Sequence, residues 1–222
     1  MESKTSAIIL MAGNSTRYNK KINKNLDKIN KKEIILYSLD VFLKNKHIDD
    51  IIIVAKKEDQ EKLIKILPKD NRIRITIGGH ERKDSVYNGL KIAKNDIVII
   101  HDGARPLIKD SYINNCLKEI KHYDGCTIGV KTKDTIKIVD KNNIVIESTK
   151  RDNTYLTQTP QCFKKDLLKK LHETNRKDNI TDDCMLLEQA GYNIKIIEGD
   201  YTNLKITTKE DLLIAELLIN KG

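Results

Sequence analysis

Short runs of branched apolar residues alternate along this chain with segments whose apolar residues recur at helical spacing. The apolar runs cover residues 7–11, 51–55, 73–77 and 97–100. Short, nearly continuous apolar runs of this kind are typical of strands buried on both faces of a parallel sheet. Helical spacing is found over residues 34–43, 59–67, 85–93, 109–122, 164–173 and 209–219. The alternation predicts an α/β fold with a mainly parallel sheet flanked by helices.

One segment departs from this alternation. Residues 135–139 and 144–148 are β-rich, and the turn sequence DKNN at 140–143 joins them. We therefore predict a β-hairpin arm within residues 132–153. A lone hairpin is marginal in water, so the arm must lie on the body of the protein or against a second subunit. No repeat, low-complexity tract or Pro/Gly-rich linker divides the chain, so residues 1–222 are expected to form a single domain.

The net charge of +9 raises the question of nucleic-acid binding. Basic residues are spread along the chain and mixed with acids, and there is no Trp for base stacking, only eight Tyr and two Phe. We therefore expect no nucleic-acid partner, because a site for small phosphorylated ligands accounts for the charge equally well. No run approaches the ~18 apolar residues of a membrane span, and the N-terminus lacks a signal-peptide pattern. These features indicate a cytoplasmic protein with no membrane partner.

The four cysteines are Cys116, Cys126, Cys162 and Cys184. None belongs to a CxxC pair, so neither a zinc site nor a disulfide framework is indicated. No base-and-orienter pattern surrounds them, which favours buried structural thiols over a nucleophile.

Ligands of open α/β sheets bind beyond the carboxyl ends of the strands, so the segments that follow the predicted strands carry the candidate chemistry. The first is MAGNSTR at 11–17, where small and polar residues let the backbone bend around a phosphate chain. It has one Gly where a dinucleotide fingerprint needs three, which disfavours a nicotinamide-dependent dehydrogenase, and it lacks a Walker A ending. Taken alone, the segment fits a basic surface loop as well as a phosphate-binding loop.

Two further segments follow predicted strands. In GGHERKDS, at 78–85, the double Gly permits close backbone approach, and Ser85 either caps the next helix or contacts a ligand. In HDGARP, at 101–106, Asp102 is placed where a carboxylate holds Mg²⁺ on a nucleotide, the alternative being a turn residue. We expect His101 to be a hydrogen-bonded structural residue rather than a metal ligand.

These segments belong to an ordered set of short motifs that extends over nearly the whole chain. The set comprises Gly13 to Arg17 with Lys24, Glu81-Arg82-x-x-Ser85-Val86, His101-Asp102-x-Ala104-Arg105-Pro106, Asp134-Thr135, Arg151, Thr159-Pro160-Gln161, Thr181-Asp182 and Asn203-Leu204-Lys205. The set resembles the 2-C-methyl-D-erythritol 4-phosphate cytidylyltransferase family of the non-mevalonate isoprenoid pathway. A sister family, the ribitol 5-phosphate cytidylyltransferases, is the alternative, and residues 81–85 and 102–106 favour the isoprenoid enzyme.

The resemblance implies a Rossmann-like nucleotidyltransferase fold and the reaction of CTP with a polyol phosphate to give a CDP-polyol and pyrophosphate. It also implies roles for individual residues. Catalytic roles fall to Arg17, Lys24, Arg151 and Lys205, and substrate binding to Asp102, Arg105, Thr135 and Thr181. The CTP pocket falls to Ala12, Gly13, Asn14, Ser15, Gly79, His80, Ser85 and Ala104. Asp102 is the implied ligand of Mg²⁺ or another divalent cation. The arm is implied to cross to a second subunit of a homodimer, with Arg151 and Thr135 serving the partner's site.

Overall fold

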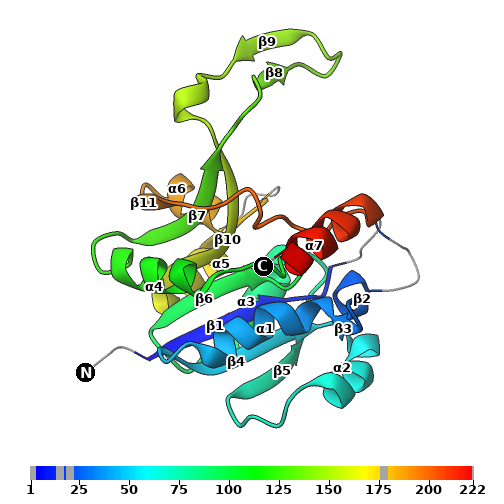
Figure 1. Ribbon diagram of the computed structural model, residues 1–222. Coiled ribbons are helices and arrows are strands. Elements are labelled where there is room, and N and C mark those ends of the chain that lie inside the picture. Colours follow the sequence, from blue (N-terminus) through cyan, green and yellow to red (C-terminus); the bar gives the residue numbers. More distant parts are fainter. Residues whose placement is uncertain (1–3, 14–17, 19–22, 176–179, 222) are drawn as a thin grey trace.

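The computed structural model describes residues 4–13, 18, 23–175 and 180–221 (Figure 1). Its centre is a seven-stranded sheet in the order β11-β7-β10-β6-β1-β4-β5. The strands are β1 (Thr5–Leu10), β4 (Ile48–Ala55), β5 (Ile73–Ile77), β6 (Ile97–Asp102), β7 (Gly125–Lys131), β10 (Tyr155–Lys164) and β11 (Ile194–Glu198). Strand β10 runs antiparallel to both of its neighbours, and the other pairs are parallel. The predicted α/β fold with a mainly parallel sheet is confirmed.

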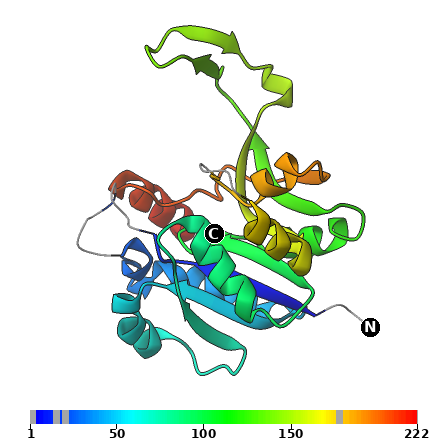
Figure 2. The same ribbon diagram turned by 180° about the vertical axis from the view of Figure 1, so that it is seen from behind.

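Side chains of successive residues on β1 enter opposite faces of the sheet, as the period of a strand requires. Ala7 and Ile9 pack in one core and Ile8 and Leu10 in the other. The first core is covered by α1 (Ile34–Lys44), α2 (Gln60–Ile66) and α4 (Asp110–Glu119). The second is covered by α3 (Arg82–Ile92), α5 (Lys165–Thr174) and α6 (Cys184–Gln189), and the view from behind shows α3 and α5 in front of the sheet (Figure 2). All four cysteines are free and buried, as expected for structural thiols.

A third, smaller core lies beside the sheet, where the C-terminal helix α7 (Lys209–Lys221) meets a short hairpin of β2 (Lys28–Ile29) and β3 (Lys32–Glu33). Ile29, Ile206 and Ala215 are buried there. Three short 3₁₀ turns complete the elements: η1 (Lys24–Leu26), η2 (Lys57–Asp59) and η3 (Arg151–Asn153). No helix within the described ranges is both long and apolar enough to cross a membrane.

The predicted arm is present as an antiparallel hairpin of β8 (Lys137–Val139) and β9 (Val145–Ser148) that projects from the body (Figure 1). Its turn is held by Asp140, whose carboxylate accepts hydrogen bonds from the backbone of Asn142 and Ile144 at 2.9 and 2.8 Å. Ile144 and Ile146 are 64% and 67% exposed. The arm therefore presents apolar side chains that the rest of the described chain leaves exposed.

Candidate active site

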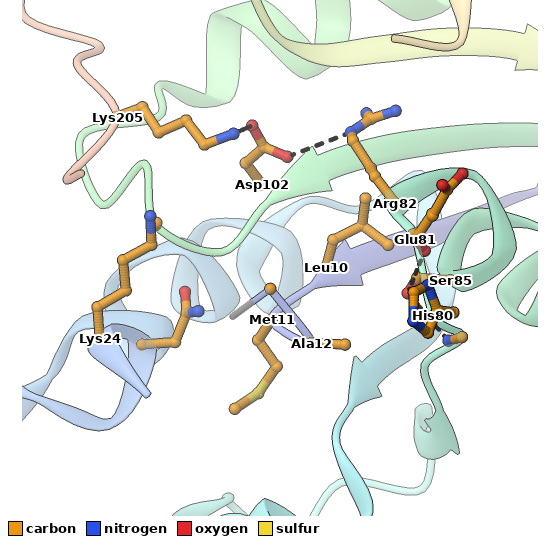
Figure 3. Close-up of a pocket in the computed structure, with 14 residues that line it drawn as sticks. Leu10, Met11, Ala12, Lys24, His80, Glu81, Arg82, Ser85, Asp102 and Lys205 are labelled. Carbon is orange, nitrogen blue, oxygen red and sulfur yellow. Dashed lines mark hydrogen bonds and ion pairs between the residues drawn. The ribbon is translucent and has the colours of Figure 1, made fainter. Parts of the chain in front are cut away.

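The loops after β1, β5 and β6 meet at one edge of the sheet and enclose a cavity of about 260 Å³ (Figure 3). Parallel strands bring their carboxyl ends to the same edge, which is why segments far apart in sequence converge here. Residues of the predicted site that line the cavity are Ala12, Gly13, Lys24, Gly79, His80, Ser85, Asp102, Ala104 and Lys205. Asn25, Glu81 and Arg82 also line it. Asn14, Ser15 and Arg17 lie outside the described residues.

Two of these loops touch through a glycine. A Cβ placed on Gly78 would lie 2.3 Å from the Cβ of Ala12, so only Gly lets the loop after β5 pass so close to the loop after β1. Gly103 is similar, because a Cβ there would lie 3.0 Å from Asn25 Oδ1 and 2.6 Å from a methyl group of Ile35. The absence of a side chain at these two glycines therefore allows the walls of the cavity to lie close together.

The hydroxyl of Ser85 holds the loop after β5. Ser85 Oγ accepts a hydrogen bond from the backbone N–H of Gly79 at 3.1 Å and donates to the carbonyl of Glu81 at 3.1 Å. Helix α3 begins at Arg82, three residues before the predicted start, and Asp84 accepts from the N–H of Glu81 at 2.9 Å. The interpretation of Ser85 as a helix cap is therefore wrong, and its hydroxyl instead shapes the wall that carries His80.

Asp102 lies at the centre of the charged part of the cavity. Its carboxylate is 2.8 Å from Lys205 Nζ and 3.9 Å from the Nε atoms of both Arg82 and Arg105. Burial alone would raise the pKa of Asp102. The three cations together lower it by more than burial raises it, so the pKa of Asp102 lies well below the ordinary value. Asp102 is therefore a permanent anion that holds three cations together.

A neutral, buried histidine lies next to this aspartate and is linked to its backbone through Thr159. His101 is fully buried, and burial lowers its pKa to about 3. Thr159 Oγ1 accepts a hydrogen bond from the N–H of Asp102 at 3.1 Å and lies 3.0 Å from His101 Nδ1, to which its hydroxyl donates. His101 Nε2 donates to the carbonyl of Arg105 at 3.3 Å. The prediction of a hydrogen-bonded structural histidine is confirmed.

Lys205 reaches the cavity because its segment is fixed at several points. Asn203, on that segment, donates to the carbonyl of Thr159 at 3.0 Å and accepts from Arg105 Nη1 at 2.7 Å through its own carbonyl. The N–H of Ile206 donates to the carbonyl of Ala104 at 2.9 Å. Arg105 is buried and is not among the described residues that line the cavity. It anchors the Lys205 segment, and its predicted contact with substrate stays a prediction.

Arg82 is a charged residue of the cavity that the sequence did not single out. Its Nη1 donates to Asp183 Oδ2 at 2.6 Å, and Asp183 is fully buried and also contacts His172 Nε2 at 3.1 Å. Burial would lower the pKa of Arg82, but Asp183 and Asp102 raise it well above its usual range. The only sequence signal was its place in the Glu81-Arg82 motif, since Asp183 lies 101 residues away.

Three residues of the predicted site, the catalytic Arg151 and the substrate-binding Thr135 and Thr181, lie apart from the cavity. Arg151 Nη2 donates to Thr135 Oγ1 at 3.1 Å at the base of the arm, and neither is among the described residues that line the cavity. Thr181 is exposed, and its hydroxyl lies 3.8 Å from the sulfur of Met185. The structure thus pairs Arg151 with Thr135 but separates both from Lys24 and Asp102 of the same chain.

The donor set of the cavity fits a divalent cation held largely by a bound nucleotide. The described residues contain no cluster of three or more His, Cys, Asp or Glu side chains suited to a metal ion. Mg²⁺, however, is commonly held by one or two carboxylates together with substrate phosphates and water. Asp102 is ionised and lines the cavity, so it meets that requirement.

An open α/β sheet with a basic, glycine-walled cavity at its carboxyl edge and one central aspartate is suited to an enzyme that binds a phosphorylated ligand. The family model for 2-C-methyl-D-erythritol 4-phosphate cytidylyltransferase matches residues 5–221. A relative of that name from Clostridium tetani is 44% identical over 99% of this chain and 92% of its own length. One from Clostridium botulinum strain 657 is 40% identical over 99% of both chains. The chain therefore belongs to the 2-C-methyl-D-erythritol 4-phosphate cytidylyltransferase family.

Solved structures agree with this assignment. The 4-diphosphocytidyl-2C-methyl-D-erythritol synthase of Anaerococcus prevotii superposes with a TM-score of 0.88 at 30% identity, over 99% of this chain and 97% of that one. The 2-C-methyl-D-erythritol 4-phosphate cytidylyltransferase of Francisella tularensis gives 0.81 at 32% identity, over 97% and 99%. The predicted nucleotidyltransferase fold is thereby confirmed.

Proposed function

We propose that this chain transfers a cytidylyl group from CTP to 2-C-methyl-D-erythritol 4-phosphate, a step in isoprenoid precursor biosynthesis. The products are 4-diphosphocytidyl-2-C-methyl-D-erythritol and pyrophosphate. The observation that carries the proposal is the convergence of Lys24, Asp102 and Lys205 on one cavity in a chain of this family. We also place the reaction in the cytoplasm, because CTP is a cytoplasmic metabolite and its charged triphosphate does not cross a bilayer unaided.

The reaction needs charge neutralisation more than a base. The attacking oxygen belongs to a phosphate monoester, which is largely dianionic at neutral pH. It forms a bond to the α-phosphorus of CTP, and the bond from that phosphorus to the bridging oxygen of pyrophosphate breaks, with negative charge spread over the phosphoryl oxygens. Lys24 lines the cavity and supplies positive charge at this centre, and Arg17 is proposed to do the same.

The wall formed by the loops after β1 and β5 is proposed to receive the cytidine. Ala12 and Gly13 lie on one side, and Gly79, His80 and Ser85 on the other, with Ala104 beside them. The glycine contacts make this slot narrow, which favours a pyrimidine over a purine. Asn14 and Ser15 are proposed to extend the backbone cradle around the triphosphate.

Asp102 is the residue that would hold Mg²⁺. When bound, the cation neutralises charge on the CTP phosphates. Lys205 Nζ lies 2.8 Å from this carboxylate, which it would have to share with a bound cation. Lys205 is therefore proposed to turn toward the acceptor phosphate when both substrates are present.

The arm, residues 132–153, is proposed to complete the site of a second copy of the chain. Arg151 and Thr135 are bonded to each other at 3.1 Å but lie apart from their own cavity, and Ile144 and Ile146 on the arm are exposed. A C2 homodimer would cover these apolar side chains and bring Arg151 and Thr135 to the partner's acceptor phosphate. Thr181 and Arg105 are proposed to contact the acceptor as well.

Complementation tests the shared site. An Arg151→Ala chain and a Lys24→Ala chain are mixed and allowed to exchange subunits. If Arg151 acts in trans, a heterodimer gathers both defects in one site and leaves the other intact, so activity returns. If Arg151 serves its own chain, every site keeps a defect and the mixture stays inactive. A monomer by light scattering at micromolar concentration would refute the dimer directly.

The substrate is tested by pyrophosphate release from CTP and Mg²⁺ with each of two acceptors, 2-C-methyl-D-erythritol 4-phosphate and ribitol 5-phosphate. We expect turnover with the first and little with the second. Preferred turnover of ribitol 5-phosphate would overturn the proposed acceptor while leaving the cytidylyl transfer intact, and release with neither would overturn the proposed reaction. Tight binding of duplex or single-stranded nucleic acid with a steep salt dependence would support the remote alternative instead.

A further inference from the structure

The turn that carries Lys24 is held by a hydrogen-bond network outside the sequence motifs. Lys24 opens η1, and the residues on both sides of it are asparagines. Asn23 precedes the turn in an extended conformation, with φ −69° and ψ 117°, and its side chain accepts from the N–H of Asn25 at 3.1 Å. The same oxygen accepts from Asn25 Nδ2 at 3.0 Å. The backbone of Lys24 is therefore fixed between two bonded neighbours.

The amide of Asn23 uses its whole bonding capacity. Its Oδ1 accepts both bonds from Asn25, and its Nδ2 donates to the carbonyl of Met11 at 2.7 Å and to Asp59 Oδ2 at 2.7 Å. A primary amide has two donors and an oxygen with two lone pairs, so no capacity is left unused. One side chain thus ties η1 to the end of β1 and to η2.

Asp59 is the charged member of this network. It ends η2, in the loop after β4, and only 7% of it is exposed. Strand β4 is the parallel neighbour of β1, so the two loops lie at the same edge of the sheet. A buried carboxylate needs hydrogen-bond donors, and a bond to an ionised acceptor is stronger than one between neutral groups. The 2.7 Å bond from Asn23 supplies such a donor.

We assign Asp59 no direct contact with substrate. It is not among the described residues that line the cavity, whereas Lys24 and Asn25 are. Asn25 is 3% exposed, and its Oδ1 lies where a Cβ on Gly103 would approach it to 3.0 Å, next to Asp102. A shift of η1 would therefore change both the position of Lys24 and the fit of Asn25 against the Asp102 loop.

We propose that Asp59 is a positioning residue for Lys24 and acts through the side-chain amide of Asn23. The proposal rests on the transition-state role given to Lys24 above. Without the carboxylate, one N–H of Asn23 loses its acceptor, and the turn moves to satisfy it elsewhere. A displacement of about 1 Å in a catalytic group costs up to about 100-fold in rate. The effect falls on kcat, because Lys24 acts most strongly in the transition state.

The test is a double-mutant cycle measured by pyrophosphate release with saturating Mg²⁺. The variants are Lys24→Ala, Asp59→Ala and the two combined. We expect Asp59→Ala to lower kcat by about 10-fold or more, with the KM values for CTP and for the acceptor nearly unchanged. In the Lys24→Ala background the same change is expected to cost no more than about 2-fold, because residues that act as one unit are not additive.

Two matched variants separate positioning from general damage. Asp59→Asn keeps an oxygen that can accept from Asn23 and is expected to retain most of the activity. Glu58→Ala removes the neighbouring acid, whose side chain is 71% exposed and 3.8 Å from Lys56 Nζ, and is expected to be as active as the unmodified chain. Thermal unfolding checks that each variant is folded. If Asp59→Ala does not fold, Asn23→Ala takes its place in the cycle, because it removes the bridge itself.

The outcomes distinguish this inference from the proposed function. Full turnover of Lys24→Ala would refute the role of Lys24, and the role of Asp59 would fall with it. If Lys24→Ala is inactive and Asp59→Ala is as active as Glu58→Ala, only the inference about Asp59 is overturned. Losses that multiply in the combined variant would also overturn it, because they would show that Asp59 acts independently of Lys24.

Discussion

The buried His101 makes a specific contribution to the pH dependence of stability. Its pKa is lowered to about 3 by burial, against about 6.5 in an unfolded chain. Below about pH 6.5 the unfolded chain therefore binds a proton at this residue that the folded chain does not. A group with a depressed pKa in the folded state contributes stability that is present above the unfolded pKa and is lost as the pH falls toward the folded value. The affected window runs from about pH 6.5 down to about pH 3.

At mildly acidic pH, the loss of stability depends mainly on the pKa of His101 in the unfolded chain. At about pH 5 the folded ring is still neutral, so the loss is about 1.36 kcal/mol for each of the ~1.5 pH units below 6.5, or about 2 kcal/mol. The neighbouring Asp102, whose folded pKa lies well below the ordinary range, adds its own acid destabilisation only near and below its unfolded pKa of about 3.9, so it contributes little above about pH 5. His101 should thus account for a large part of any acid destabilisation above pH 5.

The perturbation is His101→Gln, which removes the titrating ring and keeps an N–H that can reach the carbonyl of Arg105. The lost contacts with Thr159 and with the ring of Phe42, whose centroid lies 5.5 Å away, lower the free energy of unfolding at every pH. That cost is about 1–3 kcal/mol and does not vary with pH. The informative quantity is therefore the change in unfolding free energy between two pH values, compared between the two proteins.

The assay is urea denaturation followed by circular dichroism, at about pH 7.5 and about pH 5 and at one protein concentration, since association shifts apparent stability. We expect the unmodified chain to lose about 2 kcal/mol more than the His101→Gln variant between these conditions. His122→Gln, a change at an exposed histidine beyond the end of α4, is the matched control and should follow the unmodified chain. Equal losses in the unmodified chain and His101→Gln would refute the reasoning.

Three further predictions concern activity. Lys24→Ala should lower kcat by about 100-fold or more while the acceptor KM changes little, because the charge contact is strongest in the transition state; steady-state pyrophosphate release measures it. Asp102→Asn should keep the fold, as judged by circular dichroism, but lower the activity that Mg²⁺ supports, because a neutral amide is a poor ligand for a hard cation. Activity equal to that of the unmodified chain across an Mg²⁺ titration would contradict this. Gly78→Ala should raise the KM for CTP, because its Cβ would lie 2.3 Å from that of Ala12 and force the two loops apart; an unchanged KM would mean that the loops yield without cost.

Short apolar runs predict four of the seven sheet strands. Three of them, β1, β4 and β6, are buried along almost their whole length. The expectation of a buried strand is wrong for β5, because it lies at the edge of the sheet and is only partly buried. The first of the four was placed at residues 7–11, whereas β1 is Thr5–Leu10. The difference has a physical cause, because the polar Ser6 is buried and bonded to Asp50 at 2.7 Å. A hydrogen bond to a residue 44 positions away lets a polar side chain continue a buried strand, and no local pattern shows that.

Strand β10 was harder to predict. It contains Pro160 and two glutamines, which argue against a central strand, yet it lies between β6 and β7. The pairing with β7 is irregular between Thr157 and Gln161, so the segment around the proline does not need a regular ladder. Buried Gln158 and Gln161 find partners in Asp200 and Asp182 respectively. Long-range polar bonds of this kind again replaced the apolar pattern on which sequence reasoning depends.

The residues of the candidate site also fall into those that the sequence predicts and those that it does not. The strand-end rule located Asp102 and the three loops, because it depends only on where each strand stops. It did not locate Asp183 or Asp59, whose partners Arg82 and Asn23 lie 101 and 36 residues away. Both are buried acids that hold a residue of the cavity in place, and neither is among the described residues that line it. Supporting residues of this kind become visible only when the partners are brought together in space.

The second partner of each cation near Asp102 also determines which of these cations can move away from the aspartate. Arg82 is tied to the buried Asp183 at 2.6 Å, and Arg105 donates to the carbonyl of Asn203 at 2.7 Å, with only 11% of its side chain exposed. The Lys205 side chain is 38% exposed and carries its charge at the end of a flexible stem. Both arginines keep a second partner when a phosphate or a cation approaches Asp102, so they stay in place. Lys205 can swing without breaking the fold, and it is therefore the cation best able to move from the aspartate to an incoming phosphate.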